Sequence, residues 1–265
     1  MGAFRLSDGV REVTGCANEC PRYLYRFVRY DRLCGIITSS RLYVPPVTKL
    51  NDPFEGIVKL VPGHREKETQ ELEKIQARVN HQMCELSFSG AEDAVFNPLL
   101  WSHYADGHRG ACLKFDMQVW AQDYYPSSSP PGYVLWPVNY QMERPLVDFE
   151  KAENDNARLT GFMPNNAQAN TDPLKNIAFT KHKLWGYEQE WRMMCSRTDK
   201  EAAIYLTFPP EALTEIILGS QMPEERRQDI WCLVKGLGRS TQVCESQLDD
   251  KAFRIRVNKT TNVTR

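Results

Sequence analysis

The sequence predicts a mixed α+β protein with more strands than helices. Short runs rich in aromatic and β-branched residues recur along the chain, and such runs are typical of strands. Only a few segments carry apolar residues at helical spacing. The chain has no internal repeat and no regular alternation of strand and helix, which favours the α+β class over the α/β class.

In the N-terminal half, local signals mark where elements begin and end. Pro45 and Pro46 end a strand, because proline cannot donate to a sheet. Asn97 is a suitable N-cap, and Pro98 fits the first position of the helix that follows. We therefore expect strands at 23–28, 41–44, 83–88 and 110–115, and helices at 31–38, 64–80 and 97–105.

The C-terminal half is mostly strands, with one longer helix. Gly219 ends a buried apolar run, and Pro223 fits the first turn of a helix whose apolar residues repeat on one face. We expect this helix at 223–237, and strands at 134–140, 204–208, 215–219, 241–244, 253–257 and in the second half of 187–194. The expected domain plan is an N-terminal arm at 1–20, a single α+β domain at 21–258 with a loop insertion near 153–173, and a tail at 259–265.

Composition excludes several classes of protein. Of the 265 residues, 42% are hydrophobic and 25% are charged, as in an ordinary globular protein. The net charge is -1. A strongly basic nucleic-acid binder would carry excess positive charge, although five arginines make the segment from 22 to 41 locally basic. No apolar run is long enough to span a membrane, and residues 1–9 lack the apolar core of a signal peptide. We therefore expect a cytoplasmic protein with no membrane partner.

Three segments hold residue types that can bind a cofactor or do chemistry, and standard nucleotide, hydrolase and zinc motifs are missing. They are Tyr25-Arg26, then Ser87-Phe88-Ser89 followed by 100–106, and finally 187–192. Each also has an ordinary structural explanation. In an extended strand Glu188, Glu190 and Arg192 would share one face, so that Arg192 would pair with one of the two carboxylates.

The same segments carry a family resemblance. The runs YLYRF, NDPFE, SFS, LLWSHYADGHRGACLKFD and YEQEWR, in this order, resemble the domain-of-unknown-function family twenty-nine seventy-one. The resemblance extends over about 22–220, and WSHYADGHRG is its most specific part. The family name itself implies no activity.

A second and weaker resemblance does imply one. An early arginine, a middle S-x-S strand and a late E-x-E strand are similar to the Arg-Ser-Glu core of the ADP-ribosyltransferases. The resemblance implies two packed sheets around a cleft that holds NAD as substrate. It assigns Arg26 to the NAD phosphate or ribose, and Ser87 and Ser89 to the nicotinamide-ribose pocket. It assigns Glu190 as the catalytic glutamate and Glu188 as the residue that orients the acceptor. Phe88 departs from this pattern, since threonine is common between the two serines.

Aromatic residues beside these motifs complete the predicted NAD site. Tyr25 adjoins Arg26, and Trp101 or Tyr104 offers a flat ring on which nicotinamide could stack. Core packing explains Trp101 and Tyr104 equally well. The function implied is an NAD-dependent ADP-ribosyltransferase, a bacterial toxin or anti-phage defence effector, acting on a protein or nucleic-acid acceptor. Such a role implies a cognate inhibitor or antitoxin.

Two other functions stay open at this stage. A binding module would hold a nucleotide or a partner in the same cleft without turnover, because Arg192 next to Glu190 could neutralise the carboxylate. A metal-dependent hydrolase or nuclease would use Glu188, Glu190, Asp106 and His103 around a divalent ion. The metal reading is the weaker of the two, and no resident metal is expected.

Overall fold

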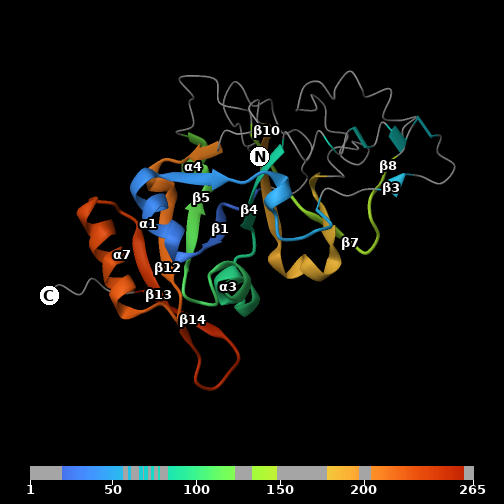
Figure 1. Ribbon diagram of the computed structural model, residues 1–265. Coiled ribbons are helices and arrows are strands. Elements are labelled where there is room, and N and C mark those ends of the chain that lie inside the picture. The colour runs from blue at the N-terminus through green and yellow to red at the C-terminus, as the bar shows by residue number, and fades with distance from the viewer. Residues whose placement is uncertain are drawn as a thin grey trace. The chain divides into compact units, whose positions relative to one another are not determined.

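The chain forms two compact units in the computed structural model (Figure 1). Unit 1 takes its described residues from Tyr43–Ser87 and Pro126–Ile204, and unit 2 takes its own from Pro21–Leu42, Phe88–Tyr125 and Tyr205–Arg265. The structure describes residues 20–55, 59–60, 66–67, 69–70, 73–74, 77, 83–122, 133–147, 178–196 and 204–259.

Unit 2 is built on a mixed sheet with the strand order β14-β13-β12-β5-β1. The central strand β5 is antiparallel to β1 and to β12, with Leu113 opposite Arg26 on one side and Ile216 on the other. Strand β12 is parallel to β13, and β14 is antiparallel to β13. The bounds are β1 (Tyr23–Val28), β5 (Ala111–Asp116), β12 (Leu213–Leu218), β13 (Gln242–Leu248) and β14 (Ile255–Lys259).

Three helices of unit 2 lie where the sequence predicts them, whereas α4 (Met117–Gln122) was not expected. The Asn97 side chain accepts a hydrogen bond from the backbone N–H of Leu99 at 3.0 Å, and Pro98 opens the helix. These features confirm the helix expected at 97–105. The helices are α1 (Tyr30–Ser39), α3 (Pro98–Tyr104), α4 (Met117–Gln122) and α7 (Glu224–Gly236), with short 3₁₀ turns η2 (Ala94–Phe96) and η4 (Pro210–Ala212).

Aromatic rings fill the core of unit 2. The ring of Phe115 on β5 lies 5.1 Å from the rings of Trp120 and Phe208 and 6.0 Å from that of Phe88, measured between centroids. All four side chains are buried. Burial of rings of this size supplies much of the hydrophobic stabilisation of a domain.

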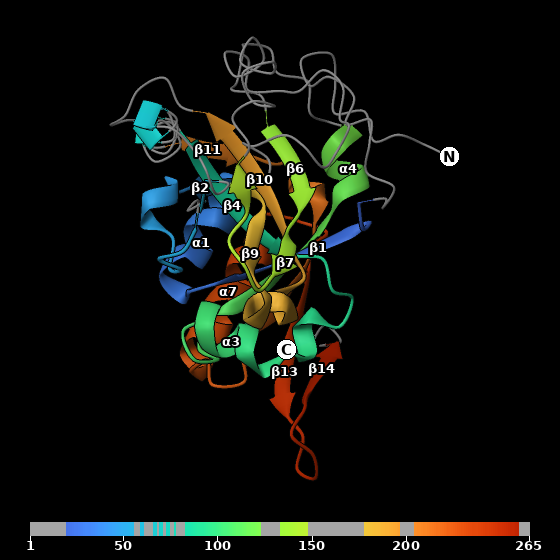
Figure 2. The same ribbon diagram turned by 90° about the vertical axis from the view of Figure 1, so that its right-hand side faces the viewer.

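Unit 1 has its own strand order, β4-β10-β6 (Figure 2). Strand β10 is antiparallel to β6, with Arg192 opposite Trp136. Strand β4 begins in unit 1 and ends in unit 2, where Ser89 lies opposite Tyr25 of β1. The bounds are β4 (Met83–Ser89), β6 (Tyr133–Pro137) and β10 (Glu190–Ser196).

The remaining strands form short two-stranded pairs. Strand β7 (Asn139–Gln141) is parallel to β9 (Thr180–His182), and β3 (Lys59–Leu60) is parallel to β8 (Leu146–Val147). Strand β2 (Arg41–Val44) pairs with β11 (Ile204–Thr207). The turns of unit 1 are η1 (Val47–Lys49) and η3 (Lys183–Glu188).

The mixed, strand-rich α+β class is confirmed, whereas two packed sheets around a cleft and a single domain over 21–258 stay predictions. The loop near 153–173 and all of the arm except Cys20 lie outside the described residues. Strand β14 ends at Lys259, one residue into the expected tail, and 260–265 lie outside the described residues. Within the described residues, no helix is both long and apolar enough to cross a membrane.

Candidate functional site

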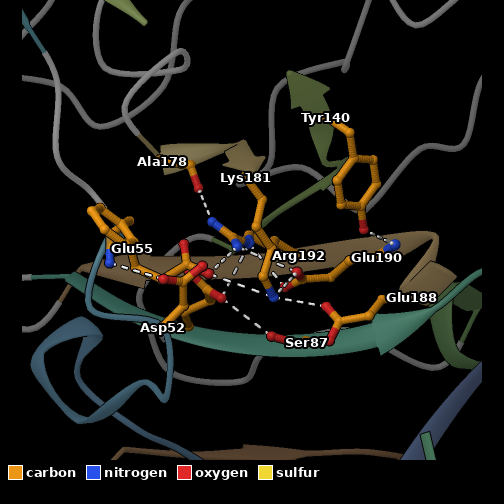
Figure 3. A network of polar contacts seen from close by, with 11 residues as sticks. Asp52, Glu55, Ser87, Tyr140, Ala178, Lys181, Glu188, Glu190 and Arg192 are labelled. Carbon is orange, nitrogen blue, oxygen red and sulfur yellow. Dashed lines mark hydrogen bonds and ion pairs between the residues drawn. The ribbon is translucent and has the colours of Figure 1, made fainter. Parts of the chain in front are cut away.

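Unit 1 contains a buried group of charged side chains, which we call the ion cluster (Figure 3). Strands β4, β9 and β10, the turn η3 and the turn at 51–55 each contribute to it. Its side chains point toward one another and are at most 6% exposed. The members are Glu55, Glu85, Lys181, Glu188, Glu190 and Arg192.

Arg192 is the centre of the ion cluster, and its side chain is only 1% exposed. Its Nε donates to Oε1 of Glu190 at 2.9 Å and lies 3.2 Å from Oε1 of Glu85. Its Nη2 donates to Oε1 of Glu55 at 2.6 Å, and its Nη1 donates to the carbonyl oxygen of Ala178 at 2.6 Å. A guanidinium presents its donors in a fixed plane, so these contacts hold several segments in one geometry.

Lys181 on β9 is the second cation of the ion cluster. Its Nζ donates to Oε2 of Glu188 at 2.7 Å and to Oε2 of Glu190 at 3.0 Å, and it lies 3.6 Å from Oε1 of Glu55. The ring of Trp185 lies beside the same ammonium, with 4.9 Å between Nζ and the ring centroid. The ammonium therefore lies between three carboxyl groups, whose negative potential stabilises its charge.

The E-x-E segment differs from the expected strand. Glu190 is the first residue of β10, but Glu188 is the last residue of the 3₁₀ turn η3. Gln189 between them has a φ of 43°, in the left-handed region, so the chain is not extended there. Glu190 and Arg192 do share a face of β10, as the two-residue period requires, whereas Glu188 reaches Lys181 from the turn.

The serine strand and the glutamate strand are neighbours in unit 1, since β4 lies next to β10. The Ser87 hydroxyl donates to Oε1 of Glu85 at 3.2 Å, and a hydrogen bond with Ser87 also helps to lower the pKa of Glu190. The backbone N–H of Glu190 donates to the hydroxyl of Tyr140 at 2.9 Å. Two of the predicted motifs therefore meet at Glu190.

The NDPFE run is the third motif that reaches the ion cluster. Oδ1 of Asp52 accepts from the backbone N–H of Phe54 at 2.9 Å, and the backbone N–H of Glu55 donates to the carbonyl of Asp52 at 3.2 Å. This turn directs Glu55 onto Arg192 and Lys181. Sequence reasoning identified the turn but missed Glu55, Glu85 and Lys181 as site residues. Only the family resemblance that included NDPFE pointed toward Glu55.

The ion cluster has more acidic than basic groups, four carboxyl groups against two cations. Burial raises the pKa of Glu55, and it raises that of Glu85 to about 8. Burial also acts to raise the pKa of Glu190, but the charges of Arg192 and Lys181 outweigh it and lower that pKa to about 2. Oε2 of Glu55 and Oε2 of Glu85 are buried without a hydrogen-bond partner. The raised pKa values of Glu55 and Glu85 favour uptake of protons, which lessens the excess negative charge of the ion cluster.

Glu85→Gln is expected to reduce the pH dependence of stability between about pH 5 and 8. The folded pKa of about 8 lies above the value of about 4.3 for an unfolded chain, so folding takes up a proton in this window. This contribution is complete below the unfolded pKa and is lost as the pH rises through the folded one. The free energy of unfolding of the wild type therefore falls with pH by up to about 1.4 kcal/mol per unit.

Urea unfolding at several pH values measures this slope for the wild type and for Glu85→Gln. Glu190 does not contribute to the change in stability over this pH range, because its pKa is lowered and it titrates in more acidic solution. An equal slope in the two proteins would show that Glu85 is not the group that takes up the proton.

The other predicted NAD-binding residues lie in unit 2. Arg26 is half-buried on β1, with its guanidinium carbon 5.9 Å from the centroid of the Phe88 ring. Tyr25 is buried, and burial raises the pKa of its hydroxyl. Ser89 is buried, and its hydroxyl accepts from the backbone N–H of Ala91 at 3.4 Å. The roles of these three residues in binding NAD stay predictions.

Trp101 and Tyr104 lie on α3 of unit 2. The Trp101 side chain is 0% exposed, and its Nε1 donates to the carbonyl of Val95 at 2.8 Å. Its ring packs edge-on against Phe27 at 5.1 Å and is stacked on His108 at 6.1 Å, so it is part of the core. Tyr104 is half-buried at the end of α3. Stacking of either ring on nicotinamide stays a prediction.

The turn at 105–110 explains the most specific part of the resemblance. Asp106, Gly107 and His108 all have positive φ, and the backbone N–H of Gly110 donates to the carbonyl of Ala105 at 2.7 Å. A Cβ on Gly110 would lie 2.1 Å from the carbonyl oxygen of Val28, so only glycine fits there. The glycine at 110 is therefore required by backbone packing inside unit 2.

No metal centre is found within the described residues, where no group of three or more His, Cys, Asp or Glu side chains is arranged to hold an ion. Glu188 and Glu190 lie in unit 1, whereas Asp106 and His103 lie in unit 2. The two carboxylates are in contact with Lys181.

Comparison with known proteins supports the first resemblance. The family model described as "Protein of unknown function (DUF2971)" matches residues 100–193, which include both the WSHYADGHRG and YEQEWR runs. Curated protein sequences give no significant match. A similar solved structure is that of Thermus sp. 2.9 DarT in complex with ADP-ribosylated ssDNA, which is 14% identical with a TM-score of 0.37. That match covers 85% of this chain and 94% of the other. The sequence resemblance to the family of unknown function is thus confirmed over 100–193.

Proposed function

We propose that the chain is an NAD-dependent ADP-ribosyltransferase in which Glu190 is the catalytic carboxylate. The observation that carries the proposal is the meeting of two motifs in unit 1. Ser87 on β4 and Glu190 on β10 come from neighbouring strands, and a hydrogen bond with Ser87 helps to lower the pKa of Glu190. Arg26, Tyr25 and Ser89 remain assigned to NAD binding under this proposal, as do Trp101 and Tyr104.

The chemistry requires an ionised carboxylate at the reacting ribose. The bond between C1′ of the ribose and the nicotinamide nitrogen breaks, and both electrons leave with neutral nicotinamide. A positive, oxocarbenium-like ribose remains, and a nearby carboxylate stabilises it. An acceptor oxygen or nitrogen then forms a bond to C1′ and releases its proton. With its lowered pKa, Glu190 is ionised at neutral pH and suits this role.

The position of Lys181 supports the same assignment. Its ammonium lies 3.0 Å from Oε2 of Glu190, so the site already stabilises a positive charge at this carboxylate. The Glu190 side chain is only 3% exposed, so NAD must displace a neighbouring group in order to reach it. We propose that the Lys181 ammonium moves away and that the positive ribosyl group takes its place. Glu188, which also binds Lys181, has the proposed role of orienting the acceptor.

Nicotinamide release from NAD by the purified protein tests this function. The assay is run alone, with total cell protein and with total RNA, so that an accelerating addition names the acceptor class. Release without any addition would indicate NAD hydrolysis by the same site. Absence of release from the folded protein in all three conditions would contradict the proposal.

A nucleotide-binding module without turnover is the second candidate function. The observation that favours it is the full pairing of Glu190, whose two oxygens are occupied by Arg192 and Lys181. Titration of the protein with NAD in a calorimeter, beside the release assay, separates the two functions. Heat of binding with no nicotinamide release would favour the module.

The biological setting belongs to the same proposal. A toxin or anti-phage effector in the cytoplasm would use NAD to modify a protein or a nucleic acid. Its host would hold it in check with a cognate inhibitor. Co-expression of this protein with the product of each neighbouring gene, with cell growth as the readout, would identify an inhibitor that relieves its toxicity.

A further inference from the structure

The connection between β13 and β14 in unit 2 is an ordered loop built on one carboxylate. Oδ1 of Asp249 accepts from the backbone N–H groups of Lys251 and Ala252 at 2.8 and 3.1 Å. Its Oδ2 accepts from Nε of Arg254 at 2.5 Å and from Nε of Arg256 at 2.7 Å. The Asp249 side chain is itself covered, with 0% exposed. One buried carboxylate therefore fixes the loop and both arginines.

The loop presents one aromatic ring and three cations to solvent. Phe253 is fully exposed, and the side chains of Arg254 and Arg256 remain 62% and 55% exposed although they are held by Asp249. Lys251 is exposed as well. In two perpendicular views this loop extends beyond the ends of β13 and β14 (Figures 1 and 2).

Ordinary structural roles do not account for Phe253. Charged residues on an edge strand such as β14 prevent pairing with other chains, which explains the arginines. An aromatic ring held in water has the opposite effect, because it adds apolar surface at the same edge. Its sequence neighbours are a small residue, Ala252, and a cation, Arg254.

We propose that this loop binds single-stranded nucleic acid, with Phe253 stacking on an unpaired base. Lys251, Arg254 and Arg256 would contact the phosphates on either side of that base. Stacking on a ring beside cations is how proteins bind single strands without reading their sequence. A protein-binding hot spot would instead place the ring inside a surrounding apolar surface, whereas Phe253 is followed directly by the exposed cation Arg254. This inference does not depend on NAD chemistry.

Fluorescence anisotropy with labelled oligo(dT) and oligo(U), in the absence of NAD, tests the proposal. We expect binding that weakens steeply between about 50 and 200 mM salt. Phe253→Ala is expected to weaken it by about tenfold or more at either salt. The double variant Lys251→Ala with Arg254→Ala is expected to weaken binding and also to lower its salt dependence.

Two matched variants in unit 2 control for loss of exposed groups in general. Tyr205→Ala removes an exposed aromatic ring from β11, and Lys235→Ala removes an exposed cation from the last turn of α7. Both are expected to bind as the wild type does. Unchanged affinity of Phe253→Ala, equal binding of a blunt duplex, or no salt-dependent binding at all would each overturn the proposal. The relative affinities of the two oligonucleotides show whether the partner is DNA or RNA.

Discussion

Glu190→Gln is expected to lower nicotinamide release from NAD by at least about 10²–10³-fold, the usual effect of removing one group that stabilises charge in a transition state. The amide keeps the size of the side chain but loses the negative charge that the positive ribose requires. The rate is measured with saturating NAD and with the most effective acceptor fraction.

We expect Glu190→Gln to fold, so that a lower rate of nicotinamide release reports on the chemical step and not on unfolding. Three carboxyl groups remain for Arg192 and Lys181 after the change. The new amide N–H₂ group will face one of these cations, which we expect to cost about 1–3 kcal/mol. That cost is small compared with the usual stability of about 5–15 kcal/mol. Urea unfolding of the variant checks this expectation.

Two control variants define the specificity of the effect. Glu55→Gln replaces a second carboxyl group of the ion cluster with an amide, and Oε2 of Glu55 has no hydrogen-bond partner that the change would remove. We expect it to lower release by less than about tenfold. Glu225→Gln, on the exposed first turn of α7, is expected to leave release unchanged. Equal rates for Glu190→Gln and the wild type would remove Glu190 from the mechanism.

Arg192→Met is expected to lower the free energy of unfolding by about 3–5 kcal/mol at neutral pH, the usual cost of breaking a buried ion pair from one side. The variant leaves Glu55, Glu85 and Glu190 facing a single cation, Lys181. It also leaves the carbonyl of Ala178 without the donor that Arg192 supplies. Urea unfolding at pH 7 measures the loss.

The pH dependence of that loss is a second test. Without Arg192 the buried carboxyl groups retain protons more readily, so the variant should recover much of its stability as the pH falls toward about 5. Arg22→Met serves as the control, because its ion pair with Asp116 involves an arginine side chain that is 56% exposed. We expect that control to lose much less stability than Arg192→Met, because water screens the exposed guanidinium of Arg22. A loss for Arg192→Met that does not vary with pH would show that unpaired charge is not its cause.

Local signals in the sequence predicted much of the secondary structure. The cap at Asn97, the proline at 223 and the alternation in 23–28 depend only on neighbouring residues, and the corresponding elements are present. The strand that was expected to include Glu188 is shorter, because Gln189 adopts a left-handed conformation that no local pattern signals. The residues on either side of Gln189, Glu188 and Glu190, both accept hydrogen bonds from Lys181.

In the ion cluster, too, the sequence predicted some features and only the fold decided the others. The resemblance to the ADP-ribosyltransferases assigned Ser87 and Glu190 to one site, which stays a prediction, and the structure places them on neighbouring strands. Glu55 and Lys181 could not be assigned, because a single glutamate or lysine gives no periodic signal. Their roles arise from desolvation and from charges brought within a few ångströms by the fold.

The sequence by itself determined the α+β class, the main helices and strands, and the residue types available for chemistry. These follow from local spacing, capping and chain stiffness, which act over a few residues. The tertiary structure alone decided that four carboxyl groups share two cations in unit 1, and that the pKa of Glu190 is lowered while that of Glu85 is raised. The pKa values of these carboxyl groups depend on burial and on the distances between charges. Both are set only when segments far apart in the chain pack together.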